Sequence, residues 1–574
     1  MTGTSGTPGA GGTPRAVADG YLDDLTALDP ILATQLGSPL GADRLPDFSP
    51  DGIAAETDLA RRALAALAAA QARPGASLET DDLERRCARL LRERLEAGLA
   101  LEQAGDRLRA LNSLGSPVQS ARSVFLAMPT TTDDDWRTIA RRMSRLETAY
   151  GGLRQSLALG RDRGLLAGPA QVETVVDQLA TWGEAGGWFS TWAGSGCPEG
   201  PRDQVTAAAA QADAAVEAMR SWLVQEYAPA TLDVPDPVGR ERYARQARYW
   251  TGADLDLDEA YEWGWQEVRR LGVEMDEGAE AVLPGATPLQ AMAHLDEHGP
   301  AIEGVEAVRE YLQQLLDDAV AAVDGVHMDL AEPVRRVEAM IAPSGTAAAP
   351  YYTRPTMDFS RPGRTWLPTM GQTRFPTWDL VSTWFHEGVP GHHLQLAQWT
   401  YVAPQLSRYQ SSIGGVSANL EGWALYAERL ADELGLLPDA AARLGYLESQ
   451  QMRAVRVVID IGMHLGLPIP ADQGRGEPLA PGRTWTPALA RQFFGRHSGR
   501  PADFLDSEIV RYLGLPGQAI GYKLGERAWL AGRAAARAAH ESRGEVFDLK
   551  AWHMAALSQG SLGLDDLAAE LALL

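Results

Sequence analysis

Three of the ten histidines in this 574-residue chain fall within one eight-residue segment, HEGVPGHH, residues 386–393. In many zinc enzymes two histidines on one helix bind the metal, and a glutamate that follows the first polarises the attacking water. Histidines that only pack in a core or end a helix at Pro-Gly are the simpler interpretation, and their clustering beside a glutamate disfavours it. The segment therefore predicts a site for one Zn²⁺ ion, with Glu387 as general base.

The histidine spacing departs from the usual one, because Pro390 stands where the second histidine would be. On an unbroken helix, His386 and His392 would point roughly 240° apart. Pro390 has no amide proton for the carbonyl of His386, and Gly391 tolerates the dihedral angles of a bulge. We expect an interruption of about two residues that returns His392 to the face of His386 and turns His393 aside. The alternative, in which His393 is the ligand, stays open.

Glu421 is the best candidate for a third ligand. It begins the segment EGWALYAE, residues 421–428, which has a helical pattern. Glu421 and Glu428 share a face with small and apolar residues, and a buried carboxylate needs a metal or a partner. A solvated acidic stripe is the simpler interpretation, and it fits the later pair Asp432–Glu433 better. A purely structural zinc is disfavoured, because such sites usually recruit cysteines and close all four positions.

These two segments resemble the bacterial domain-of-unknown-function 885 family, and the resemblance runs from Tyr21 to Ala519. That family is similar to the helical zinc peptidases that include carboxypeptidase Taq and the thimet-type enzymes. The resemblance implies zinc bound by His386, His392 and Glu421, with Glu387 as general base.

The resemblance also points to two later segments, residues 453–464 and 511–523. In the first, Asp460 and His464 lie four residues apart on one helical face; a ligand-orienting or substrate-contacting pair and an ordinary helix-surface hydrogen bond are both open. In the second, Tyr522 could stabilise an oxyanion and Arg511 a terminal carboxylate; a packed tyrosine and a surface charge are the alternatives. The predicted site residues are Glu387, Tyr522 and His464 for catalysis, Arg511, His393 and Lys523 for substrate binding, and Asp460 and Glu428 for orienting the ligands.

The elements that must position these residues are mostly helical. Ala and Leu recur at spacings of three and four, and Gly or Pro marks many of the gaps, which predicts helices over 54–71, 83–103, 133–159, 204–227, 257–282 and 307–323. Between Ala348 and Pro376, aromatic and β-branched residues alternate with Pro and Gly, which predicts two or three short strands. We expect a mainly α, large helical zinc-peptidase-like fold with this small β element before the active-site helix and a deep cleft.

The chain length allows one or two large cores. We expect a disordered tail over residues 1–16 and then a single helical catalytic domain over residues 17–574. Its N-terminal helical half would end at about residue 340, and its metal-site half would begin at about residue 341.

The composition narrows the class of partner. A net charge of −24 and a pI near 4.9 disfavour nucleic acid and anionic membranes. Two cysteines, Cys87 and Cys197, exclude a disulfide scaffold and a Cys-rich zinc module. The first residues carry no apolar leader, and no later stretch is long and apolar enough to span a membrane. A soluble cytoplasmic protein is therefore expected, with no nucleic-acid or membrane partner.

These inferences together predict a zinc-dependent hydrolase, most simply a metallopeptidase that cleaves short peptides with a metal-activated water. A metal-dependent amidohydrolase or a tailoring enzyme acting on a small metabolite would use the same residues and is the first alternative. A metal-binding scaffold without turnover is the second, and Glu387 disfavours it, because a scaffold needs no base beside the metal.

Overall fold

The computed structural model describes residues 12–73, 81–343, 349–474 and 476–574. The chain forms two compact units. Unit 1 comprises the described residues up to Glu84, Arg94–Val238 and Val510–Leu515, and unit 2 comprises Arg85–Glu93, Gly239–Ile509 and Pro516–Leu574. These units differ from the two halves expected to meet at about residue 340, and a single catalytic domain stays a prediction. Most of the expected disordered tail lies outside the described residues, but its last residues are helical, because the first helix begins at Pro14.

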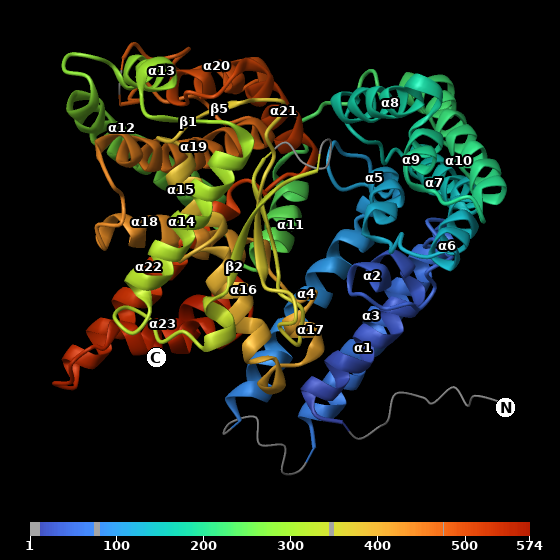
Figure 1. Ribbon diagram of the computed structural model, residues 1–574, viewed down its shortest axis with the longest axis horizontal. Helices are drawn as coiled ribbons and strands as arrows, with labels where there is room; N and C mark the ends of the chain where they lie inside the picture. Colours follow the sequence, from blue (N-terminus) through green and yellow to red (C-terminus); the bar gives the residue numbers. More distant parts are fainter. Residues whose placement is uncertain (1–11, 74–80, 344–348, 475) are drawn as a thin grey trace. The chain divides into compact units, whose positions relative to one another are not determined.

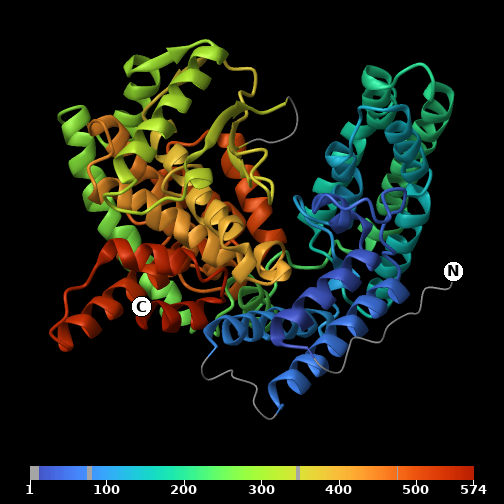
Figure 2. The same ribbon diagram turned by 60° about the horizontal axis from the view of Figure 1, so that its bottom comes forward.

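Unit 1 is a bundle of helices (Figure 1; Figure 2). Within it, α10 packs against α6, α7, α8 and α9. Its helices are α1 (Pro14–Leu28), α2 (Pro30–Gln35), α3 (Pro50–Gln71), α5 (Pro117–Ser123), α6 (Asp133–Met143), α7 (Leu146–Asp162), α8 (Pro169–Gly183), α9 (Trp188–Gly196) and α10 (Arg202–Trp222), while α4 (Asp82–Gln103) and α21 (Ala502–Gly514) contribute residues to both units.

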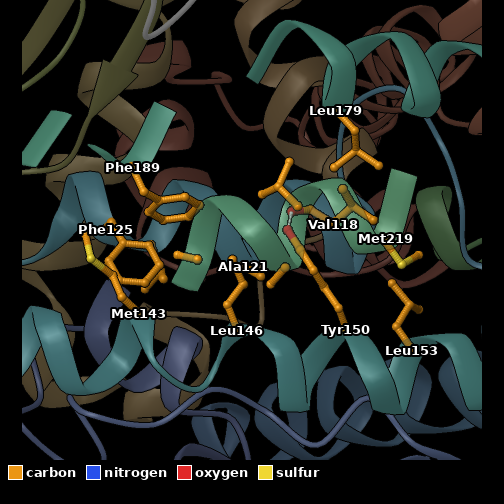
Figure 3. Close-up of a cluster of buried hydrophobic side chains, with 14 of the residues drawn as sticks. Val118, Ala121, Phe125, Met143, Leu146, Tyr150, Leu153, Leu179, Phe189 and Met219 are labelled. Atoms are coloured by element: carbon orange, nitrogen blue, oxygen red, sulfur yellow. Dashed lines mark hydrogen bonds between the residues drawn. The ribbon is translucent and has the colours of Figure 1, made fainter. Parts of the chain in front are cut away.

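The core of unit 1 is largely apolar, and the hydroxyls of its tyrosines Tyr150 and Tyr227 are bonded to the main chain; Figure 3 shows Tyr150. The Tyr150 hydroxyl donates to the carbonyl of Val118 at 3.2 Å, so this buried polar group is satisfied. Phe125 meets Phe189 edge to face, with ring centroids 5.2 Å apart. Among the residues described, the group of side chains that could hold a metal ion does not lie in this core.

Unit 2 holds the predicted motifs. Its longest helices, α12 (Leu257–Val282) and α19 (Ala440–Leu465), pack along each other, and α15 (Leu380–Glu387) packs on both α18 (Ser417–Glu433) and α19. The other helices of this unit are α11 (Arg240–Thr251), α13 (Pro288–His298), α14 (Val305–Val323), α16 (His392–Tyr401), α17 (Arg408–Ser411), α20 (Pro487–His497), α22 (Gly521–Ser542), α23 (Leu549–Leu557) and α24 (Leu564–Ala572).

A small β element precedes α15, as the sequence predicts. Strand β4 (Gly363–Leu367) lies between β2 (Val337–Ile341), which is parallel to it, and β3 (Tyr351–Thr353), which is antiparallel. A second pair joins β1 (Ala301–Glu303) to β5 (Arg374–Pro376) in antiparallel register. β1 and β2 were not expected, because they lie before the segment in which the sequence predicts strands.

Most predicted helices in the first half of the chain are present, and α12 has the predicted bounds. The single helix expected over 133–159 is wrong, because the chain breaks at Ser144 and continues as α7. The mainly α fold with few short strands is confirmed, whereas the deep cleft stays a prediction.

The position of α18 is set by a close backbone contact with α22. A Cβ atom on Gly525 would lie 2.0 Å from the Ala418 carbonyl oxygen and 2.7 Å from the Gly422 Cα atom. A side chain at this crossing would therefore push apart the two backbones. Glycine at this point lets α18 lie against α22 without an intervening side chain.

A buried histidine also joins α18 to α23. His553 on α23 is 1% exposed, and its Nε2 lies 2.7 Å from the Tyr426 hydroxyl on α18. Burial and the nearby charge of Arg533 together lower the pKa of His553 to about 3, although a hydrogen bond to the His327 backbone opposes this shift. This histidine is therefore neutral in the folded protein at ordinary pH.

Replacing Gly525 with Ala should lower the free energy of unfolding by about 1–3 kcal/mol, because the new methyl group overpacks the crossing of α18 and α22. The matched control is Gly98→Ala in α4, where nothing lies within 4 Å of the added Cβ. That change should stabilise the protein by about 0.5–1 kcal/mol through helix propensity. Urea unfolding of both variants checks this, and a neutral Gly525→Ala would contradict the close contact.

Acid should destabilise the protein through His553. Its folded pKa of about 3 lies below the unfolded value near 6.5, so only the unfolded state takes up a proton between these values. The free energy of unfolding then falls as the pH falls through this window, by at most about 1.4 kcal/mol per pH unit. His553→Gln, which keeps an acceptor for Tyr426, should flatten the slope by that amount. Unfolding curves at several pH values measure it, and equal slopes would exclude the histidine as the cause.

Candidate metal centre

The helix that carries the first predicted ligand breaks before the second. α15 ends at Glu387 and α16 begins at His392. Across the break, the Gly391 amide donates to the carbonyl of Phe385, six residues back, at 3.0 Å. A Cβ atom on Gly391 would lie 2.0 Å from the His386 carbonyl oxygen, so no larger residue fits here. The additional residues in the break bring the His392 ring beside that of His386, with centroids 4.9 Å apart.

A tryptophan on α18 holds this break in place. The Trp423 Nε1 donates to the carbonyl oxygens of Pro390 and Gly391, at 3.1 and 3.0 Å. Its ring is fully buried. Because α18 also carries Glu421, the same helix fixes the break and supplies the carboxylate.

His386, His392 and Glu421 meet at one point. A Glu421 Oε2 lies 3.4 Å from the His386 Nε2 and 3.6 Å from the His392 Nε2. One donor atom from each of the three residues lies within 4.8 Å of the others. With zinc–ligand distances of about 2.0–2.2 Å, neighbouring ligand atoms of a tetrahedral site lie about 3.3 Å apart. The spacing and the donor types therefore fit a zinc ion.

Glu428 orients the first histidine. Its Oε1 lies 2.7 Å from the His386 Nδ1, and its Oε2 accepts a hydrogen bond from the Ser382 hydroxyl at 2.9 Å. Glu421 and Glu428 lie two helical turns apart on one face of α18, so they contact opposite edges of the same imidazole. With Nδ1 bonded to a carboxylate, Nε2 is the nitrogen presented to a metal.

The charges of the site complement each other. Burial would lower the pKa of His386, but its hydrogen bonds to Glu421 and Glu428 outweigh this and raise it to about 9. Burial would raise the pKa of Glu421, but His386 and His392 hold it well below its usual range. Burial would also raise the pKa of Glu428, but Arg453 and His386 hold it below its usual range. Both carboxylates therefore stay ionised and favour a cation between the three donors.

The charged groups around the metal donors shift the pKa of Glu387. Burial raises the pKa of its carboxyl, the charges of His392, His386 and Arg453 lower it, and Glu421 raises it. The net pKa is above the usual value for a glutamate. A carboxylate of raised basicity beside the donors is suited to accept a proton at near-neutral pH.

Arg453 on α19 is a site residue that the sequence reasoning did not single out. Its Nη2 lies 3.9 Å from the Glu428 Oε1, and its Nη1 donates to the Ser449 hydroxyl and, at 3.1 Å, to the Ser449 carbonyl. Its Nε has no hydrogen-bond partner among the residues the structure describes. One sequence signal was available for Arg453. It lies among mostly apolar residues that cover every face of the helix, which indicates that the side chain is buried.

Both ring nitrogens of His393 are bonded away from the metal donors, and its predicted contact with substrate stays a prediction. It is fully buried, with Nε2 2.7 Å from the Val334 carbonyl and Nδ1 3.0 Å from the Tyr352 hydroxyl. A carbonyl only accepts, so Nε2 carries the proton and Nδ1 accepts from Tyr352. His393 therefore ties α16 to the β element, and burial lowers its pKa to about 4.

Lys523 also faces inward rather than toward a substrate. It is fully buried, and its Nζ donates to Gln450 at 2.7 Å and to Glu526 at 2.5 Å. A buried ammonium needs such partners, and the bond to Gln450 joins α22 to α19. Its expected contact with substrate stays a prediction.

Asp460 and His464 form a structural pair near the end of α19. Asp460 accepts from the Tyr243 hydroxyl at 2.8 Å and from the Gly517 amide at 3.0 Å, and His464 is 1% exposed. His464 lies eleven residues beyond Arg453, or about 16 Å further along the helix. These partners give Asp460 a structural role, and the predicted roles of His464 in catalysis and of Asp460 in orienting a ligand stay predictions.

The two remaining predicted residues lie on other helices than the metal donors. Tyr522 is half-buried on α22, and the Arg456 guanidinium lies over its ring at 5.0 Å. Arg511 belongs to unit 1 and lies over the ring of Tyr512 at 5.0 Å. Their roles toward an oxyanion and a carboxylate stay predictions.

Comparison with known proteins gives a family and a fold. The profile of a family described as bacterial protein of unknown function (DUF885) matches residues 30–571. No curated protein matches the chain significantly.

Solved structures match along nearly the whole chain. A putative lipoprotein from Colwellia psychrerythraea has a TM-score of 0.82 and 21% identity, and the match covers 97% of this chain and 98% of that one. A putative lipoprotein of unknown function from Shewanella oneidensis has a TM-score of 0.74 and 17% identity, with 98% and 100% covered. A carboxypeptidase from Pyrococcus furiosus reaches a TM-score of 0.42 and 12% identity over 98% and 95%, a likeness too weak to carry an argument.

The expected cytoplasmic location is wrong, because two structures that share the fold over nearly their full length are described as putative lipoproteins. Within the described ranges, none of the helices is both long and apolar enough to cross a membrane.

Metal analysis should separate the two adjacent histidines. His392→Ala should lose bound zinc, because it removes one of three converging donors, whereas His393→Gln should retain about one equivalent. The glutamine keeps a donor for the Val334 carbonyl, and thermal unfolding of both variants controls for loss of structure. Plasma mass spectrometry of protein loaded with zinc measures the content. Zinc retained by folded His392→Ala and lost by folded His393→Gln would overturn the ligand assignment.

Proposed function

Because the chain belongs to a bacterial family of unknown function (DUF885), we propose its activity from its own metal centre: a zinc-dependent hydrolase that cleaves peptide bonds of short peptides. The observation that carries the proposal is the convergence of two histidines and one glutamate with a second glutamate next in sequence to the first histidine. Three protein donors leave one position of a tetrahedral ion open, which is typical of catalytic rather than structural zinc.

Each residue of the site has a separate role in the proposed hydrolysis. His386, His392 and Glu421 would hold the ion, which supplies Lewis acidity toward a carbonyl and toward water when bound. Glu387 would take the proton from the attacking water and pass it to the leaving amine. Glu428 fixes the orientation of the His386 ring through the 2.7 Å contact between its Oε1 and the His386 Nδ1.

Charge balance supports the same assignment. Glu387, Glu421 and Glu428 bring three negative charges to the site, and Arg453 brings one positive charge. With both histidines neutral, a divalent cation balances this set. The buried Arg453 would thus hold Glu428 in its ionised form while His386 acts as a neutral ligand.

A peptide substrate is supported by the β element beside the site. α16 packs on β4, and within the described residues β3 has β4 as its sheet neighbour, so its other edge has free backbone groups. An extended peptide can pair with such an edge. Tyr522 is proposed as the hydrogen-bond donor to the developing oxyanion.

Cleavage of a defined peptide library, followed by mass spectrometry, tests the substrate class. We expect zinc-dependent cleavage of short peptides that stops when a chelator removes the metal and returns when zinc is restored. An amidohydrolase acting on small metabolites would leave every peptide intact while it hydrolyses simple amides. No turnover of either class by zinc-loaded protein would contradict the proposed hydrolase.

Replacing Glu387 with Gln should reduce kcat by about 100-fold to 10,000-fold, because the amide cannot accept the proton from water. Zinc content and thermal stability should stay close to wild type, since Glu387 is not among the three metal donors. Glu338→Gln on β2 is the matched control, because this carboxylate pairs with Arg364 and has no contact with the donors. An unchanged rate in Glu387→Gln would remove it as the base.

A further inference from the structure

An arginine on α5 has no charged partner. Arg122 forms no hydrogen bond and no ion pair with any residue that the structure describes. Other arginines of unit 1 have a carboxylate partner, as Arg220 has in Glu217 at 2.8 Å. In a chain with a net charge of −24, carboxylates are abundant, so a guanidinium without one is an exception. The proposed hydrolysis makes no use of Arg122.

Two tryptophans contact this guanidinium. The Arg122 Cζ lies 4.5 Å from the ring centroid of Trp182 on α8 and 4.7 Å from that of Trp188 on α9. Trp188 in turn stacks on Trp192, with centroids 5.6 Å apart and ring planes within 5° of parallel. Three helices of unit 1, all labelled in Figure 1, therefore set the geometry of this group.

The tryptophans stabilise the charge of Arg122 but provide no acceptor for its N–H groups. A cation–π contact is made with the face of a ring, whereas the N–H donors lie in the plane of the guanidinium. Its Nε is buried without a partner, and the side chain is otherwise partly exposed, so the two Nη groups form the edge that a ligand can reach. A half-buried charge of this kind favours a partner of opposite sign.

The pKa of Arg122 agrees with the absence of a counter-charge. Burial lowers this pKa, and the opposing effect comes from the Tyr150 hydroxyl rather than from a carboxylate. Tyr150 itself donates to the Val118 carbonyl. The guanidinium nevertheless stays protonated at neutral pH, because an arginine does not lose its proton in proteins. A single positive charge is thus available to an anion.

The chemistry of this group favours a carboxylate over a phosphate. The planar fork of an arginine matches the two oxygens of a carboxylate. A phosphate dianion would need further donors, and Arg122 is the only charged residue of α5. The start of α9 does not add any, because the Phe189 and Ser190 amides donate to Asp213 at 2.9 and 3.0 Å. Beside the fork the ligand meets indole rings, which suit a flat apolar body.

We propose that Arg122, Trp182 and Trp188 form a binding site, separate from the metal centre, for a monocarboxylate carried on a flat, apolar group. The carboxylate accepts hydrogen bonds from the two Nη groups, and the apolar group lies against the indole rings. The ligand supplies the counter-charge that the described residues do not provide. The site does not depend on the proposed hydrolysis, because the three metal donors belong to unit 2.

Benzoate and benzamide are the matched probes, because they share a ring and a planar head group and differ in charge. Saturation-transfer NMR of the zinc-loaded full chain should show that benzoate binds at least about tenfold more tightly, as charge-assisted hydrogen bonds imply. Inorganic phosphate should bind more weakly than benzoate. Carboxylates also bind zinc, so the titration is repeated after chelation, and the benzoate site should remain. Equal affinities for the two probes, tighter binding of phosphate, or loss of the site with the metal would overturn the proposal.

Variants of the arginine provide the second test. Arg122→Met keeps the apolar stem of the side chain and should abolish benzoate binding. Arg122→Lys keeps the charge but not the fork, and should weaken binding without abolishing it. Arg220→Met, which removes a paired arginine of the same unit, is the control and should bind as wild type does. Benzoate binding to folded Arg122→Met at the wild-type affinity would also overturn the proposal.

Chemical modification of the wild-type protein locates the site without a variant, and decides the question if Arg122→Met does not fold. Phenylglyoxal forms adducts with accessible guanidinium groups, and peptide mapping should find it on Arg122. Benzoate at about ten times its dissociation constant should slow this modification about tenfold, whereas benzamide at the same concentration should not. An unmodified Arg122, or a rate that benzoate does not change, would contradict the proposed site.

Discussion

The metal centre depends on the two hydrogen bonds from Trp423 to the carbonyls of Pro390 and Gly391. A broken helix leaves main-chain carbonyls without partners, and burying them unpaired would be costly. Trp423 offsets that cost from α18, the helix that also carries Glu421 and Glu428. A shift of α18 would therefore move the two carboxylates and His392 together, so their relative positions are fixed by this one helix.

Local sequence was sufficient for much of this arrangement. Pro390 and Gly391 act on their own backbone, so their effect on the helix can be derived from neighbouring residues alone. The alignment of Glu421 with Glu428 likewise follows from helical geometry. The β element was predicted for the same reason, since Tyr351 and Trp366 stand in short alternating stretches.

The surroundings of the polar residues on α19 could not be predicted in the same way. α19 is buried on every side over most of its length, so its charged residues look the same in sequence whether they serve chemistry or structure. The partners that fix the role of Asp460 are Tyr243 and Gly517, which are remote in sequence. Arg453 was overlooked for the converse reason, because its nearness to Glu428 arises only when α18 and α19 pack. The role of a buried polar residue depends on its tertiary contacts, and helical periodicity in the sequence does not predict these contacts.

The glycine contact between α18 and α22 has a consequence for how such a protein can diverge. Where two backbones touch, no substitution can adjust their separation by small steps, because the smallest possible side chain already overfills the gap. The metal-binding frame is thus held constant, while side chains that line the surrounding space are free to vary. New specificities on this scaffold would arise by exchange of those wall residues around an unchanged centre.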